Sequence, residues 1–262
     1  MRVKPNKGDR WTRDEMIIVF NLYFKMSYGQ MDHRNQQVKD LAMLMGRSAN
    51  SIAMRLNNFA SCDPLLKARG ISGLSAHTKI CQPYWDEFFN NQEALVFESE
   101  KILAEYQDIT IEEKFKDDLE DIPVGLVGET KIREVKTRVN QNFFRQIVLA
   151  NYDYKCALTG IDIKDLLIAS HIVPWSENIT ERLNPENGIC LSALYDKAFD
   201  KGYISFDDNG KVIFSSILEQ KVSNEYYAKF FLPIKDCCIV TPKKYFPNAL
   251  FLEWHRDVIF KK

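Results

Sequence analysis

The 262-residue sequence has no long apolar run, no C-x-x-C cysteine pair and almost no net charge. No stretch approaches the roughly 20 apolar residues needed to cross a bilayer. The opening segment, MRVKPNKGDRW, is polar and lacks the apolar core of a secretory signal. We therefore expect a cytoplasmic protein that does not use a membrane as a partner.

The six cysteines contain no C-x-x-C pair. Closed structural zinc sites usually draw on such pairs, so we expect reduced cysteines and no thiolate-bound zinc. The formal net charge of −1 gives no overall basic excess that would indicate a nucleic-acid partner. Any attraction to DNA must therefore come from individual segments.

The sequence does contain enough apolar material for two modest domains, with 45% hydrophobic and 12% aromatic residues. Residues 1–73 hold twelve Lys or Arg against six Asp or Glu, whereas residues 86–121 hold three against thirteen. DIPVGLVGET, at residues 121–130, adds the proline and glycines typical of a linker. We predict a helical DNA-binding domain at 1–107, an acidic linker at 108–130 and a second domain at 131–262.

Two helix starts can be assigned in the first domain. Thr12 and Glu15 match a capping box, which predicts a helix that begins there and continues to about Met26. Ser48 is a suitable N-cap for a later helix. Both signals precede apolar residues at helical spacing.

The segment VKDLAMLMGRSANSIAMRLNNF has the spacing of a helix-turn-helix, with Ala42, Gly46 and Ile52 at its key positions. A small residue lets the helices approach, glycine makes the turn, and a branched residue holds the second helix. With Trp11 near the first helix, the unit also resembles a Myb-like three-helix domain. The outward positions expected to enter a major groove are Asn50, Ser51, Met54 and Arg55, with Arg47 just before them. The alternative is a helical bundle that does not touch DNA.

Basic character returns in KIREVKTRVNQNFFRQIVLANYDYKCALTG. Arg138 and Arg145 are two turns apart on the predicted helix, while Phe144, Ile147 and Val148 face inward. The two arginines are candidates for phosphate contacts. The alternative is that this helix only braces the next domain.

The residues suited to chemistry lie between 156 and 214, which read as a loop, a strand, a loop, a second strand, a helix and a hairpin. His171 ends the apolar strand, and Asn187 begins the second strand sixteen residues later. Asp196 and Asp200 are one turn apart on the helix. Carboxylates at this spacing repel each other unless each finds a cation or a hydrogen-bond partner.

The other histidines are expected to be structural or exposed. His255, in FLEWHRDVIF, should pack on Trp254, and a phosphate contact made together with Arg256 is the alternative. His33 and His77 are expected to be polar surface residues.

The order of histidine, asparagine and two aspartates resembles the HNH nucleases, which have a ββα-metal core. Within them, CALTG…ASHIVPWSE…ERLNPENGICLSALYDKAFDKGYISFDDNG is similar to a subgroup of bacterial restriction and defence endonucleases. The resemblance covers about residues 130–260. It implies an α+β protein in which an all-α helix-turn-helix-like domain is joined by an acidic linker to a C-terminal HNH domain.

The resemblance also implies site roles. His171, with an ordinary pKa near 6.5, is suited to act as the general base that activates water. Asp196 and Asp200 offer hard oxygen ligands for Mg²⁺ or Mn²⁺, and Ser170 occupies a further ligand position with a weaker hydroxyl. Asn187 would tie the intervening loop together rather than touch substrate.

We therefore expect a metal-dependent endonuclease that cuts double-stranded DNA in a restriction or phage-defence setting and leaves 5′-phosphate and 3′-hydroxyl ends. Because one HNH site cuts one strand, a homodimer is considered as well. The alternative is a DNA-binding regulator with an inactive HNH-like half, since Ser170 and Asp196 replace commoner ligands. A nuclease acting on RNA is a third reading, and the helix-turn-helix spacing favours DNA.

Overall fold

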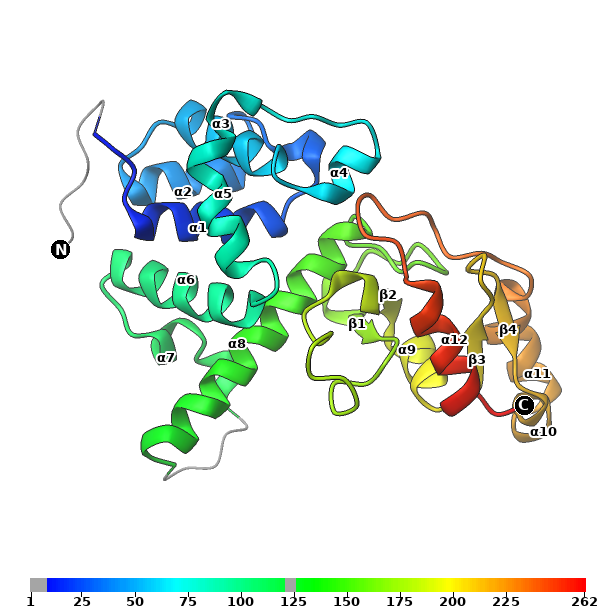
Figure 1. The fold of residues 1–262 in the computed structure, drawn as a ribbon. Coiled ribbons are helices and arrows are strands. Elements are labelled where there is room, and N and C mark those ends of the chain that lie inside the picture. Colours follow the sequence, from blue (N-terminus) through cyan, green and yellow to red (C-terminus); the bar gives the residue numbers. More distant parts are fainter. Residues whose placement is uncertain (1–8, 121–125) are drawn as a thin grey trace. The chain divides into compact units, whose positions relative to one another are not determined.

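The computed structural model of the protein describes residues 9–120 and 126–262 (Figure 1). Residues 121–125, with the proline and the first glycine of the predicted linker, lie outside the described residues. The chain forms two compact units, Met1–Phe143 and Phe144–Lys262. Every strand in the described part of the chain belongs to the second unit, and the mixture of helices with two small sheets agrees with the α+β class.

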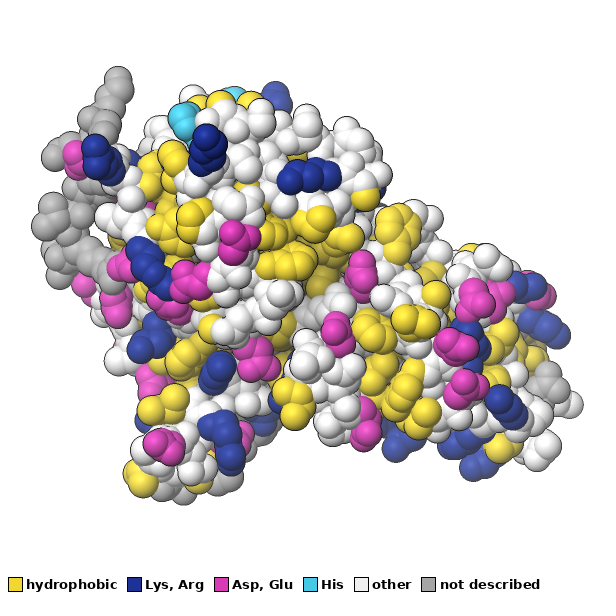
Figure 2. Space-filling model, in the orientation of Figure 1, with side chains coloured by type: hydrophobic (Ala, Val, Ile, Leu, Met, Phe, Trp, Pro, Cys, Tyr) yellow, Lys and Arg dark blue, Asp and Glu magenta, His cyan; other side chains and the backbone are white. Residues whose placement is uncertain are grey.

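All the regular elements among the described residues of the first unit are helices. Its helices are α1 (Arg13–Phe24), α2 (Gln36–Met45), α3 (Ala49–Ala60), α4 (Pro64–Ala68), α5 (Thr78–Phe88), α6 (Gln92–Tyr106), α7 (Ile111–Lys114) and the part of α8 (Gly128–Asn151) up to Phe143. Helix α7 lies within the segment predicted as a linker, and Phe115 just after it is buried. On the visible face of this unit, acidic and basic side chains are interspersed (Figure 2).

The predicted helix starts are confirmed. The hydroxyl of Thr12 accepts from the Glu15 amide at 3.3 Å, and the Glu15 carboxylate accepts from the Thr12 amide at 2.8 Å. Ser48 caps α3 by accepting from the amide of Ser51. Gly46 ends α2 with a left-handed φ of 70°, a conformation that glycine adopts without a steric penalty.

Aromatic packing and one buried charge cluster hold the first unit together. The Phe20 ring of α1 stacks on Phe59 of α3 at a centroid distance of 4.4 Å. Burial alone would raise the pKa of Glu100 on α6, but Lys25 and Lys114 lower it to about 2. The acidic stretch therefore includes a packed helix whose carboxylate is neutralised internally.

The second unit contains both sheets. Its elements after Phe143 are the rest of α8, β1 (Leu167–His171), β2 (Gly188–Ser192), α9 (Ala193–Asp200), β3 (Ile204–Phe206), β4 (Val212–Phe214), α10 (Ser216–Lys221), α11 (Asn224–Tyr226) and α12 (Ala249–Val258). Strands β1 and β2 pair antiparallel, as do β3 and β4. This is the strand, strand, helix and hairpin order predicted from the sequence.

Helix α12 closes the core of the second unit through His255. The imidazole stacks on Phe199 of α9 at a centroid distance of 3.8 Å, bonds the Ser205 hydroxyl at 2.9 Å and bonds the Phe199 carbonyl at 3.1 Å. The prediction that His255 packs is confirmed, but its stacking partner is Phe199 rather than Trp254. Arg256 donates to the Phe206 carbonyl and pairs with Asp208, so it also has a structural role.

The length and the apolar character of the helices decide whether one of them could cross a membrane. None of those in the described part of the chain combines the length and the apolar character that a crossing requires.

Candidate active site in the second unit

Helix α8 packs directly on the β1–β2 hairpin because Gly188 has no side chain. Gly188 lies opposite His171 in the strand register. A Cβ at Gly188 would lie 2.5 Å from the Val148 side chain and 2.8 Å from the Phe144 ring. The missing side chain lets the Phe144 ring stack on the His171 imidazole, with centroids 3.7 Å apart and planes 12° apart.

The His171 ring is held at one nitrogen and open at the other. Its Nε2 lies 3.0 Å from the carbonyl oxygen of Arg182, so Nε2 carries the proton when the imidazole is neutral. Nδ1 then has a lone pair and no hydrogen-bond partner among the described residues. Burial lowers the pKa of His171 to about 4, against the raising effect of the Arg182 carbonyl. At neutral pH the ring is therefore uncharged and able to accept a proton.

Trp175 and Arg182 enclose the same imidazole. The Trp175 ring meets His171 edge-on at 5.6 Å. The Arg182 guanidinium lies 5.1 Å from the centre of the Trp175 ring, and its Nε donates to the Trp175 carbonyl at 2.7 Å. These contacts fix the loop that supplies the carbonyl for His171.

Asn187 closes the loop between the two strands. Its side-chain oxygen accepts from the Val173 amide at 2.8 Å, and its side-chain nitrogen donates to the carbonyls of Val173 at 3.0 Å and Glu181 at 3.3 Å. The side chain is buried. This is the loop-tying position that the sequence resemblance implied for Asn187.

Asp196 and Asp200 lie on α9, which packs against both strands of the hairpin. Burial, and then the charge of Asp200, raise the pKa of Asp196, and burial raises the pKa of Asp200. Ser170 is near enough for its hydroxyl to favour the charged form of Asp196, yet its Oγ is buried without a hydrogen bond of ordinary geometry. Two crowded carboxylates and an unsatisfied hydroxyl thus lie together.

The side chains of Asp196, Asp200 and Ser170 offer oxygen atoms, which are the ligands that a hard cation prefers. No group of three His, Cys, Asp or Glu side chains able to hold a metal occurs among the described residues. The available oxygens come from two carboxylates and one hydroxyl, which suits Mg²⁺ or Mn²⁺ better than zinc. A bound cation would relieve the repulsion that raises the pKa of Asp196.

Residues 156–207 match the HNH_2 family model, described as HNH endonuclease. We call this stretch the HNH segment. It contains His171, Asn187, Asp196 and Asp200, so the family match indicates a nuclease that acts on nucleic acid. No curated protein matches the chain.

The two candidate phosphate-binding arginines of α8, Arg138 and Arg145, donate hydrogen bonds within the protein. Arg145 donates to the carbonyls of Leu167 at 2.6 Å and Lys164 at 3.1 Å, so it braces the start of β1. Arg138, in the first unit, donates to the Gln141 side chain at 3.4 Å. For Arg145, bracing is the role supported by its contacts.

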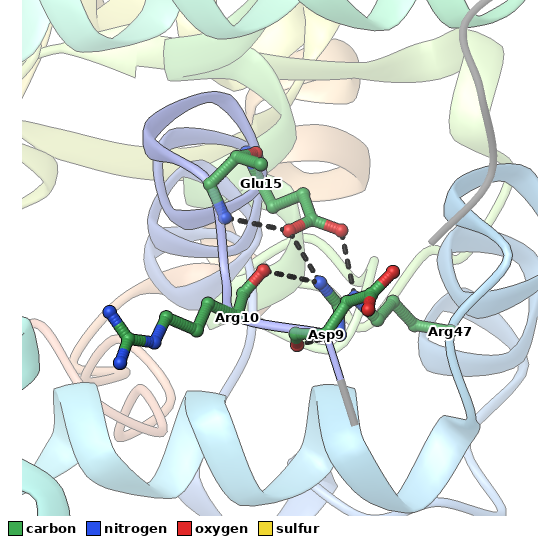
Figure 3. Close-up of polar contacts among 5 residues, drawn as sticks. Asp9, Arg10, Glu15 and Arg47 are labelled. Atoms are coloured by element: carbon green, nitrogen blue, oxygen red, sulfur yellow. Dashed lines mark hydrogen bonds and ion pairs between the residues drawn. The ribbon is translucent and has the colours of Figure 1, made fainter. Parts of the chain in front are cut away.

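The expectation that Arg47 is available to a major groove is wrong, because its guanidinium is bound by groups of Asp9, Arg10 and Glu15 (Figure 3). Its Nε and Nη2 donate to the two carboxylate oxygens of Glu15 at 2.8 Å each, and two further bonds reach the carbonyls of Asp9 and Arg10. Only 8% of the side chain is exposed. Its donors therefore hold the segment before α1.

Arg55 is likewise directed inward. It is buried, and its guanidinium lies 4.8 Å from the centre of the Trp11 ring, while that of Arg47 lies 4.9 Å from it. Asn50 is exposed and Ser51 is partly exposed. The outward side of α3 is therefore neutral, with Met54 52% exposed.

Sequence reasoning missed Phe144, Trp175 and Arg182 as neighbours of His171. Phe144 is predicted to face inward, but nothing in the sequence pairs it with His171. The glycine opposite the histidine is the one available signal, since it permits close helix packing. Arg182 acts through its main-chain carbonyl, which any residue type supplies, so its identity carries no signal.

Proposed function

We propose that the protein is a metal-dependent endonuclease that hydrolyses phosphodiester bonds of double-stranded DNA, with His171 as the general base. The observation that supports it most is the open Nδ1 of a neutral imidazole within the HNH segment, on a strand packed against the helix that carries Asp196 and Asp200.

His171 would take a proton from water through Nδ1, while the Arg182 carbonyl holds the proton on Nε2 and fixes the ring. The stack on Phe144 restricts rotation of the ring, so the acceptor nitrogen keeps its direction. The products would be a 5′-phosphate and a 3′-hydroxyl. Asn187 positions the base by closing the loop but does not react.

Asp196, Asp200 and Ser170 are the residues that would hold a divalent ion, Mg²⁺ or Mn²⁺. When bound, the ion neutralises negative charge that develops on the phosphate and the leaving oxygen. The chain's own contribution is to place both carboxylates on one face of α9, with Asp196 buried and Asp200 exposed.

The test is cleavage of supercoiled plasmid in EDTA, Mg²⁺ and Mn²⁺ by wild type, His171→Ala and Asp196→Asn. His77→Ala and Asp165→Asn change an exposed histidine and an exposed aspartate and serve as matched controls. We expect cleavage that requires the metal, His171 and Asp196 and that both controls retain. Full-rate cleavage by His171→Ala would rule out the assigned base, and metal-independent binding without cleavage would favour the regulator.

The wider setting belongs to the same proposal. A restriction or phage-defence role predicts fewer plaques on cells that express the wild type than on cells that express His171→Ala. A homodimer, one way to cut both strands, predicts a sedimentation mass twice that of the 30.5 kDa chain.

A further inference from the structure

Two lysines contact one tyrosine just after α9, and a third, Lys201, precedes that tyrosine by two residues. Lys261 Nζ lies 4.5 Å and Lys221 Nζ 5.6 Å from the centre of the Tyr203 ring, and Lys221 also donates to the Tyr203 hydroxyl at 3.4 Å. The hydrogen bond from Lys221 and the charges of Lys221, Lys261 and Lys201 lower the pKa of Tyr203. We call Lys201, Lys221 and Lys261 the Tyr203 cluster.

The backbone builds this cluster from three separate segments. Lys201 directly follows α9, Lys221 ends α10, and Lys261 lies beyond α12. Gly202 has a φ of 68°, and a Cβ there would lie 2.0 Å from the carbonyl oxygen of Ile259. The segments around Gly202 and Ile259 therefore lie close together, and the Lys261 amide donates to the Gly202 carbonyl at 3.0 Å.

The cluster carries no counter-ion among the described side chains. Among the side chains that the structure describes, none forms an ion pair with Lys201, Lys221 or Lys261, whereas nearby Arg256 and Lys211 pair with Asp208 and Asp236. Like charges that share a site repel each other, and binding of an anion removes this cost. Figure 2 shows dark blue side chains gathered along the lower edge of the second unit, beneath α9 and α12.

The cluster begins where the candidate metal site ends. Lys201 directly follows Asp200, the last residue of α9, so the cluster lies at the end of the helix that carries the two carboxylates. Lys201 also acts on Tyr203. A strand bound at the carboxylates would therefore meet the lysines next.

We propose that the Tyr203 cluster binds the backbone phosphates of duplex DNA beside the phosphate that is cut. This inference rests on the proposed nuclease function. Lys201 and Lys221 are exposed and Lys261 is partly exposed, so the cluster presents a surface suited to a polymer of phosphates. Lysine ammonium groups are point charges without the planar fork that reads bases, so the contact fixes position and carries no sequence preference.

The test measures binding of a duplex of about 20 base pairs at several salt concentrations, in a His171→Ala background that does not cut. Lys201→Gln, Lys221→Gln and Lys261→Gln are combined in one variant. The plot of log affinity against log salt has a negative slope. We expect its steepness to decrease by about 2.7, since each lost phosphate contact removes about 0.9. Affinity near 0.1 M salt should fall at least about tenfold.

Two matched variants separate this from a general loss of charge or fold. Lys101→Gln, Lys155→Gln and Lys235→Gln remove the same charge from exposed positions elsewhere and should leave the slope unchanged. Replacing the three cluster lysines with arginine keeps the charge and should keep the slope. Equal slopes for the cluster variant and the Lys101, Lys155, Lys235 variant would overturn the inference, as would a loss confined to duplex RNA.

The inference and the proposed function can fail separately. If wild type cuts DNA and the cluster variant binds like its control, only the phosphate surface is refuted. If wild type cuts no DNA with any metal while the cluster variant loses its salt slope, the nuclease proposal fails and the phosphate surface stands as a binding site.

Discussion

His171 and His255 both lie in the second unit, and each stacks on a phenylalanine ring, at 3.7 and 3.8 Å. Burial lowers the pKa of each to about 4, and each bonds one main-chain carbonyl. They differ at the second nitrogen. His255 uses it on the Ser205 hydroxyl and is 1% exposed, whereas His171 keeps Nδ1 open and lies near α9 and its carboxylates.

The comparison shows that a low pKa and an aromatic stack do not by themselves identify a catalytic histidine. Both features follow from burial beside apolar groups, which disfavours the charged form. The open nitrogen distinguishes the candidate base, because proton transfer needs an acceptor that the protein has not already satisfied. The following predictions test whether the two histidines divide chemistry and stability in this way.

Replacing His171 should have the largest effect on cleavage. We expect His171→Ala to cut plasmid at least about 100-fold more slowly, since a positioned general base typically contributes that much. Initial rates at equal folded concentration, well below the thermal midpoint, measure this. If His171→Ala cut plasmid at the wild-type rate, His171 would not be the general base and the open Nδ1 would not distinguish it from His255.

Replacing His255 should instead lower stability. His255→Ala leaves the Ser205 hydroxyl and the Phe199 carbonyl without a partner and opens a cavity beside the Phe199 ring. We expect the free energy of unfolding in urea to fall by about 2–4 kcal/mol. The folded fraction should cut at nearly the wild-type rate, and the exposed control His77→Ala should change stability by less than about 0.5 kcal/mol.

Asn187 should affect both properties. Asn187→Ala leaves the buried amide and carbonyl of Val173 unpaired, so we expect a loss of about 1–3 kcal/mol in the free energy of unfolding. Cleavage should also slow, because the loop that orients His171 is released. Asn209→Ala, at an exposed turn, is the control. A loss of stability with normal cleavage would refute the positioning role.

Adding one carbon at Gly188 should shift the Phe144 ring. Gly188→Ala places a methyl group 2.8 Å from that ring, and we expect about 1–3 kcal/mol of destabilisation from overpacking. Gly29→Ala meets no atom within 4 Å and serves as the control. Equal urea midpoints for the two variants would show that α8 can shift to accept the methyl group without a loss of stability.

The smallest effect should be seen in the pH dependence of stability. The pKa of His255 is lower in the folded chain than its ordinary 6.5, so its contribution is fully present above pH 6.5 and is lost as the pH falls through about 4. His255→Gln cannot take up this proton. Urea unfolding between pH 7 and pH 4.5 should therefore show a shallower decline than in wild type, and parallel curves would contradict this.

The sequence predicts local structure well and the partners of side chains poorly. Thr12, Ser48 and the strand that ends at His171 follow from capping and periodicity, which depend on neighbours in the chain. The stack of Phe144 on His171 and that of His255 on Phe199 depend on how distant segments pack. For the same reason, the spacing around Gly46 predicts two helices and a turn but not which side of α3 faces the core.

The burial of Arg47 and Arg55 changes what an approaching polyanion would encounter. A formal count of charge along residues 1–73 treats every arginine as if it faced water. The charge of Arg47 is largely neutralised by the ion pair with Glu15, and the charge of Arg55 is buried. Fewer positive charges of this segment therefore face an approaching polyanion than the count of twelve Lys or Arg suggests, and its long-range electrostatic steering is weaker to that extent.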